Sequence, residues 1–290
     1  MNLWAFFTAV IAMLILPLST TKARDYPLPP HTAFALPKNS KVRASWLVPS
    51  SENQLTSREA IIFAVSDAGE PWLGIRGRHL YNPLRRVILP VDREMQDFVF
   101  LRDREFVVLS TNTLGFLIFK KEEPTLKFIP ILELPSDEGK LFRGEQNRLY
   151  ILLKNKTNGE YEIYRLTEKG GRGVVEKIFA TKESINDLCE SGNYIYIASG
   201  WLVLGLDLER KSVFLHYKHK EPIREIECFG DFGIFYATDR KIGFIGKKNP
   251  FEFAHVDSPQ IILRKNTLYI LLKKHLGIIK IDNVQELKNY

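Results

Sequence analysis

Short apolar runs separated by polar turns make up most of this chain, and one kind of run recurs. These runs are rich in β-branched and aromatic residues and are bounded by Asn, Asp, Gly or Lys, a pattern typical of β-strands. No segment keeps apolar residues at helical spacing over three turns. The recurring runs are AIIFAV (60–65), EFVVLS (105–110), RLYILL (148–153), YIYIAS (194–199), GIFYAT (233–238) and TLYILL (267–272).

The spacing of these runs indicates a repeat. Their central residues lie 45, 43, 46, 39 and 34 positions apart. Another apolar run precedes each copy from the second onward, and two more follow most copies, so a unit holds four strands. Four-stranded units repeating every ~40–45 residues predict a β-propeller. One such sheet cannot bury both of its faces, so neighbouring sheets must stack around an axis.

The sixth unit lacks an outer strand. It supplies strands at 259–264, 267–272 and 276–282, after which only NVQELKNY remains. Segment 32–48 holds strand-like stretches that are left over, and we predict that one of them completes the last blade and removes an exposed edge. The Lys and Asn content of residues 284–290 favours a solvated C-terminal tail. The alternative is that this tail supplies the missing strand.

Two hairpins carry a resemblance to known proteins. Residues 193–211 and 266–282 both read as a turn, an apolar-Tyr-apolar strand, a short loop and then Leu-Gly or Leu-x-x-Asp. In these features the chain resembles the six-bladed β-propeller superfamily, in the manner of NHL and TolB-like propellers. The resemblance implies a fold and no activity. We therefore expect an all-β, six-bladed propeller of four-stranded antiparallel blades over residues 42–283, closed by an N-terminal strand.

The N-terminal segment predicts export. Residues 3–18 form an uncharged apolar run, and Thr21 and Ala23 fit a small-residue cleavage site, so residues 1–23 read as a signal peptide. The run is shorter than the ~20 residues of a bilayer span. We expect a periplasmic or extracellular protein, with an uncleaved membrane anchor as the alternative. Residues 24–41 hold four Pro and predict an extended arm.

Cysteine content excludes a disulfide scaffold, because the 290 residues include two Cys. Cys189 and Cys228 fall in neighbouring units. Aligning Gly192 with Gly230 sets the two cysteines one position out of phase, so that they point to opposite faces of their strands. This favours two buried thiols. A disulfide is the alternative, and it would need a bulge or a twist between the blades.

Turns between successive units form the candidate binding site. In a propeller these turns meet on one rim of the axis, and here each carries at least one carboxylate. Such a ring could bind Ca²⁺ or a basic partner. Interleaved Arg93, Lys140 and Lys182 would partly neutralise the ring, and surface turns favour acids in any case. The ring consists of Asp92, Glu94, Asp137, Glu138, Glu183, Glu221 and Asp257.

Basic residues outnumber acidic ones, 41 Lys and Arg against 34 Asp and Glu, and some of them cluster in the first unit. An exported basic surface favours an anionic glycan, a membrane surface or an acidic protein, and the export signal argues against nucleic acid. Scattered solubilising charge is the alternative. The cluster consists of Arg76, Arg78, Arg85 and Arg86.

No catalytic set is recognisable in the sequence. It contains no nucleophile elbow, no Gly-rich phosphate loop and no His spacing for a metal. We therefore expect a non-enzymatic propeller without cofactor, acting as a protein-binding scaffold or a subunit of an envelope or extracellular complex. The alternative is a calcium-dependent propeller enzyme, lactonase-like or glycan-acting, that uses axial carboxylates. A glycan sensor is a third possibility, which the lack of an aromatic cluster confined to loops disfavours.

Overall fold

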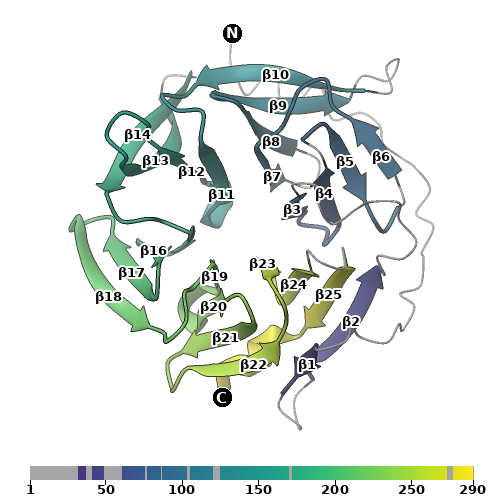
Figure 1. The fold of residues 1–290 in the computed structure, drawn as a ribbon, viewed down its shortest axis with the longest axis vertical. Helices are drawn as coiled ribbons and strands as arrows, with labels where there is room; N and C mark the ends of the chain where they lie inside the picture. Colours follow the sequence, from purple (N-terminus) through teal and green to yellow (C-terminus); the bar gives the residue numbers. More distant parts are fainter. Residues whose placement is uncertain are drawn as a thin grey trace.

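Six antiparallel sheets are arranged around a central axis in this computed structural model (Figure 1). It describes residues 32–36, 41–48, 61–75, 77–85, 87–102, 105–119, 125–169, 172–272 and 277–289. Within these residues five sheets have four strands and one has five. The six-bladed all-β fold predicted from the repeat is therefore confirmed.

Each blade is built from strands that follow one another along the chain. The first three blades are β3 (Ile61–Val65), β4 (Pro71–Ile75), β5 (His79–Asn82) and β6 (Val87–Pro90); β7 (Asp97–Arg102), β8 (Glu105–Ser110), β9 (Thr113–Phe119) and β10 (Leu126–Glu133); and β11 (Gly139–Arg143), β12 (Leu149–Lys154), β13 (Tyr161–Lys169) and β14 (Arg172–Thr181).

The remaining blades follow the same order, with short 3₁₀ helices between some strands. They are β15 (Asp187–Ser191), β16 (Tyr194–Ser199), β17 (Leu202–Asp207) and β18 (Ser212–Lys218); β19 (Glu225–Cys228), β20 (Gly233–Ala237), β21 (Lys241–Gly246) and β22 (Phe251–His255); and β23 (Pro259–Arg264), β24 (Thr267–Leu272) and β25 (Gly277–Asp282). The 3₁₀ helices are η2 (Glu145–Asn147), η3 (Gly230–Phe232) and η4 (Val284–Asn289).

The innermost strands contact one another around the axis, and β3, β7, β11, β19 and β23 face the middle of Figure 1. The first blade departs from the repeat pattern, because residues 61–65 are its innermost strand although the equivalent runs elsewhere are second strands. Its strand β5 is only four residues long, HLYN, too short for the hydrophobic pattern to indicate.

Two N-terminal strands close the ring. β2 (Arg43–Val48) pairs antiparallel with β25 and completes the sixth blade, as predicted. β1 (Ala33–Phe34) adds a fifth strand to the fifth blade by pairing with β22. Figure 1 shows both strands beside the last ones of the chain. The pairing covers an edge that would otherwise be open to other chains.

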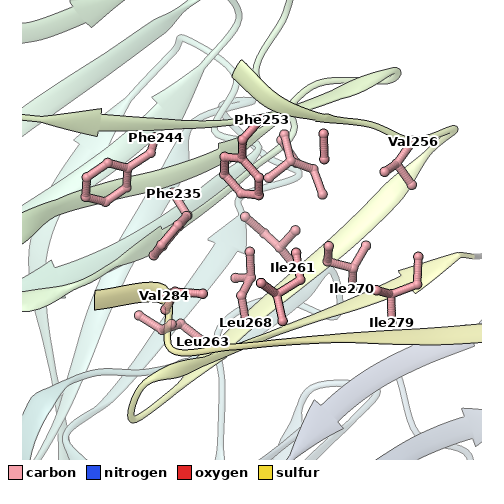
Figure 2. Packing of buried hydrophobic residues seen from close by; sticks show 14 of the residues in the cluster. Phe235, Phe244, Phe253, Val256, Ile261, Leu263, Leu268, Ile270, Ile279 and Val284 are labelled. Atoms are coloured by element: carbon pink, nitrogen blue, oxygen red, sulfur yellow. The ribbon is translucent and has the colours of Figure 1, made fainter. Parts of the chain in front are cut away.

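The largest apolar cluster lies between the fifth and sixth blades, where Phe235, Phe244 and Phe253 face the aliphatic side chains of the sixth blade (Figure 2). The C-terminal segment contributes to it. Val284 and Leu287 of η4 are fully buried, so the expectation of a solvated tail is wrong. Val284 and Leu287 are three positions apart, with polar residues between them. A single helical turn with one buried side is too short to be recognised from this pattern.

Cys189 and Cys228 form a disulfide between β15 and β19, with 5.4 Å between their Cα atoms. The expectation of two buried thiols is therefore wrong. It rested on equating the turns at Gly192 and Gly230, but the turn of the fifth blade contains η3. Cys189 pairs across its hairpin with Tyr196 and Cys228 with Ile234, so strand positions rather than turn glycines determine the phase.

The N-terminal predictions lie largely outside the described residues. These include the signal peptide at 1–23 and most of the arm at 24–41, so export and anchoring stay predictions. In the part of the chain that the structure describes, no helix has the length and apolarity needed to cross a membrane.

Candidate functional site

Three carboxylates stand at the first position of innermost strands: Asp97 on β7, Asp187 on β15 and Glu225 on β19. Each accepts a backbone N–H from the innermost strand of the next blade. The donors are Leu141, Ile226 and Ile261, each at 2.7 Å. The innermost strands of successive blades lie next to one another around the axis. An acid at the start of one such strand can therefore accept a backbone N–H from the innermost strand of the next blade. The carboxylates thus connect neighbouring blades at the start of the strands nearest the axis.

A lysine lies among these acids. Lys140 of β11 donates from Nζ to the carbonyl oxygen of Asn186 at 3.0 Å, and its charge acts on both Asp97 and Asp187. Asn186 in turn donates from Nδ2 to the carbonyl oxygen of Ile223 at 2.7 Å. The arrangement places one ammonium near two carboxylates at the same end of the innermost strands.

A cavity of about 330 Å³ opens beside this cluster, on the rim where successive blades are joined. Arg224 and Asp239 form a bidentate ion pair at its edge, with both N–O distances 3.0 Å. The cavity is lined by Lys140, Ile185, Asn186, Arg224, Glu225, Thr238, Asp239, Ser258 and Pro259.

Burial raises the pKa values of the axial acids towards neutrality. It raises the pKa of Asp97 to about 6, although backbone donors from Leu141 and Phe98 favour the charged form. It raises the pKa of Asp187 to about 7, where the charge of Lys140 opposes the shift and that of Asp97 adds to it. Two carboxylates that exchange protons near pH 7 can act as general base or general acid.

A second charged pair lies further along the innermost strands, between Glu227 of β19 and Arg264 of β23. Burial raises the pKa of Glu227 on β19 to about 8, and the charge of Arg264 on β23 opposes this shift. Arg264 donates from Nε to the carbonyl oxygen of Val65 at 2.8 Å, which ties the sixth blade to the first. The next seam, between the first two blades, is apolar instead, with Trp72, Phe98 and Phe106 packed together.

The carboxylates predicted from the inter-blade turns lie on this rim, but several are engaged away from the axis. Asp92 accepts the N–H of Phe128 in the outer strand β10 at 2.9 Å. Asp137 pairs with Lys156 at 2.7 Å, and Glu138 lies 3.8 Å from the same ammonium. These three acids contact residues of the second and third blades, and a binding role for the ring stays a prediction.

The other predicted ring members are similarly local. Glu221 accepts a hydrogen bond from Thr238 at 3.1 Å and lies 3.4 Å from Lys241. Glu94 and Glu183 are exposed, and Asp257 accepts from Ser258 at 3.4 Å. The acids that begin the innermost strands come a few residues later in the sequence. A carboxylate directly before a buried apolar residue, as in DFVF, DLCE and EIEC, is the signal that marks them.

The predicted basic cluster is only partly within the described residues. Arg85 donates from Nε to Glu70 at 3.1 Å, and Arg78 is exposed. Arg76 and Arg86 lie outside the described residues. A role for this cluster in binding anionic partners stays a prediction.

A calcium centre does not fit the described residues. They contain no group of three or more His, Cys, Asp or Glu side chains that could hold a metal ion. Asp97, Asp187 and Glu225 already accept backbone N–H groups, and the ammonium of Lys140 repels a cation.

Comparisons with known proteins support the fold. No protein-family model and no curated protein matches the sequence. Among solved structures, a luciferin-regenerating enzyme matches with a TM-score of 0.58 and 12% identity, covering 83% of this chain and 95% of that one. Regucalcin from Agrobacterium tumefaciens, described as calcium-binding, matches with a TM-score of 0.56 and 15% identity. The match covers 79% of this chain and 90% of regucalcin. A gluconolactonase from Xanthomonas campestris matches with a TM-score of 0.55 and 9% identity. The match covers 89% of this chain and 98% of the gluconolactonase.

These likenesses define a six-bladed β-propeller, and they correct the functional expectation. The sequence favours a non-enzymatic scaffold only because no catalytic motif is visible in it. Structural neighbours with the same fold are named as enzymes, so the absence of a motif is no argument against an enzyme. We therefore no longer favour the non-enzymatic scaffold over its alternative, a calcium-dependent propeller enzyme that uses axial carboxylates.

Proposed function

We propose that the protein is a propeller hydrolase that opens lactones or related esters at the end of its central channel. The observation that carries this proposal is the pair Asp97 and Asp187, two axial carboxylates whose pKa values are about 6 and about 7. The charge of Lys140 acts on both, and Lys140 and Asn186, the residue before Asp187, line a cavity of about 330 Å³. The names of the structural neighbours support the reaction class by analogy of fold alone.

Asp187 acts as the general base in this proposal. Water attacks the carbonyl carbon of the lactone while Asp187 takes one of its protons. Lys140 stabilises the negative charge that develops on the carbonyl oxygen. The ring C–O bond then breaks, and Asp187 returns the proton to the leaving oxygen. Lactone and water become a hydroxy acid, and the enzyme is unchanged.

Asp97 is a positioning residue. Its charge raises the pKa of Asp187, and its hydrogen bond to Leu141 holds β11, and with it Lys140, beside the acid pair. The proposal uses no metal, because the donor set beside the channel does not suit calcium.

The test is hydrolysis of D-glucono-δ-lactone, measured above the spontaneous rate, by the unchanged protein and by Asp187→Asn. The amide can still accept the N–H of Ile226, so the fold is retained. Loss of the base should lower kcat by about 100-fold or more. In the unchanged protein kcat should rise with pH and level off above about 7, because Asp187 must be ionised.

Glu176→Gln is the matched control, since Glu176 is an exposed acid on the outer strand β14. It should leave both kcat and the pH profile unchanged. Failure of the unchanged protein to accelerate hydrolysis of the lactone and of phenyl acetate would overturn the proposal. A rate that collapses with a chelator and returns with Ca²⁺ would contradict its metal-free form.

A further inference from the structure

A second and larger cavity lies between the fourth and fifth blades, away from the axial acids. Its volume is about 760 Å³, within the range of small-molecule sites. It opens where β15 turns into β16 and β19 into β20. β15 carries Asp187 at its first position and Ser191, which lines this cavity, at its last. The two cavities therefore lie at opposite ends of the blades.

Aromatic rings form much of the cavity wall. Tyr194 and Tyr196 of β16 lie with ring centroids 6.3 Å apart, and His216 of β18 packs edge-on against Tyr196 at 4.8 Å. Phe232 of η3 comes from the facing blade. Tyr194 and Phe232 stay 37% and 41% exposed, so ring surface is available to a ligand. The ammonium of Lys288 lies 4.4 Å from the ring centroid of Phe232. Tyr194 contacts Phe214 edge-on at 5.8 Å and keeps 37% of its surface exposed, so its ring offers the remaining free face.

Neutral, acidic and basic hydrogen-bonding side chains line the cavity around these rings. Asn193 donates from Nδ2 to Glu209 at 2.7 Å, which fixes both side chains at the entrance. Asp207 caps the adjoining turn by accepting the N–H groups of Glu209 and Arg210 at 2.9 Å. Asp207, Glu209 and Asp231 are acidic, while Arg210 and Lys247 are basic. The charges nearly balance, so the lining selects neither cations nor anions strongly.

The walls of this cavity are held in place. The disulfide between Cys189 and Cys228 joins the two blades, two residues before Ser191 and Gly230, which both line the cavity. A ligand would therefore enter a preformed cavity and incur less ordering cost.

We propose that this inter-blade cavity binds a neutral saccharide. A pyranose ring has an apolar C–H face, which suits the exposed ring of Tyr194, and a rim of hydroxyls, which suits Asn193 and Glu209. A purely apolar ligand would desolvate the charged lining without replacing its hydrogen bonds. An ionic ligand would meet charges of both signs. This site is separate from the proposed hydrolase centre and does not depend on it.

Calorimetric titration of the full chain with maltohexaose, cellohexaose and chitohexaose tests the inference. At least one of these hexasaccharides should bind. Tyr194→Ala should weaken that binding by about tenfold, equivalent to 1.4 kcal/mol, while Tyr194→Phe should keep it, because the ring face makes the contact. Glu209→Ala, an exposed change on a turn, should weaken binding about fivefold and guards against misfolding of the Tyr194 variant.

Trp201→Ala is the matched control. Trp201 is an aromatic residue of the same blade, 56% exposed, between β16 and β17 at the opposite end of the blade. It should leave the affinity unchanged. The inference is overturned if none of the three hexasaccharides binds the unchanged protein. It is also overturned if folded Tyr194→Ala and Glu209→Ala bind as well as the unchanged protein, or if Trp201→Ala weakens binding as much as they do.

Discussion

Glu227 shows how a single acid can oppose folding. Its pKa lies at about 8 in the folded protein, mainly because of burial, against an ordinary value of 4.5. Between these pH values the folded state holds a proton that the unfolded state has released. Stability therefore falls as pH rises through this window. The backbone of Leu263 donates to Glu227, and the charge of Arg264 only partly offsets the burial.

Glu227→Gln should raise the melting temperature at pH 8 by about 2 °C or more and change it little at pH 5. The amide keeps the acceptor for Leu263 and has no proton to lose. Thermal melts at both pH values measure the difference. The exposed change Glu176→Gln should show no such pH dependence. An equal effect of Glu227→Gln at pH 5 and pH 8 would show that burial does not raise the pKa of this group.

At the residue scale, the sequence predicts the chemistry of the candidate site better than its positions. It indicates carboxylates where successive blades join, and axial acids occur on that rim. It misses Asp97, Asp187 and Glu225, because alternation along the inner strands decides which acid faces the channel. A pattern of charged turns carries no information on that choice. The aromatic cavity is missed for a related reason, since Tyr194 and Tyr196 belong to a strand and look like core residues.

At the element scale, the 3₁₀ helix η4 behaves as part of the core. Leu287 has no exposed surface and packs in the cluster between the fifth and sixth blades. The backbone of the same segment is anchored by Asn266, whose side chain accepts the N–H of Gln285 at 2.7 Å. The six residues of η4 thus pack against the seam between the fifth and sixth blades.

Leu287→Ala should destabilise the protein by about 3 kcal/mol, because it opens a cavity in a packed cluster. Chemical denaturation measures this difference. Gln285→Ala changes an exposed side chain of the same helix and should cost less than about 0.5 kcal/mol. A negligible effect of Leu287→Ala would restore the view of a solvated tail.

Strand existence is predicted well from the sequence, and strand phase less well. The recurring runs of blades two to six are their second strands, which are largely buried on both faces and therefore stand out as apolar. Together with their flanking turns they locate most of the other strands. The first blade is misassigned, since β5 is short. The pairing of Cys189 with Cys228 is missed because η3 lengthens one turn and not the other. Both errors come from local irregularities inside a regular repeat.

At the scale of the whole molecule, closure depends on residues before the first blade. Val42 is 3% exposed and belongs to the apolar cluster between the fifth and sixth blades. Phe34 and Leu36 pack against the same cluster. β2 also satisfies the hydrogen-bonding edge of β25. The six-fold repeat, read from the sequence, leaves a gap at this position, and that gap is why the closing strand could be predicted.

A chain that starts at residue 49 should therefore melt roughly 10 °C or more below one that starts at residue 32. The shorter chain loses β1, β2 and the apolar residues between them, and its β25 edge becomes free to pair with other molecules. Thermal melts and size-exclusion chromatography measure both effects. Equal melting temperatures and a monomeric shorter chain would contradict the role of closure.

The pairing of β2 with β25 also dictates an order of events during synthesis. β2 precedes its partner β25 in the chain, so it leaves the ribosome earlier. Until residues 277–282 have emerged, the early strand has no native neighbour, and the ring stays an open arc with a bare edge at each end. Closure of the ring is thus a contact between segments about 230 residues apart, and it can form only after residues 277–282 have been synthesised.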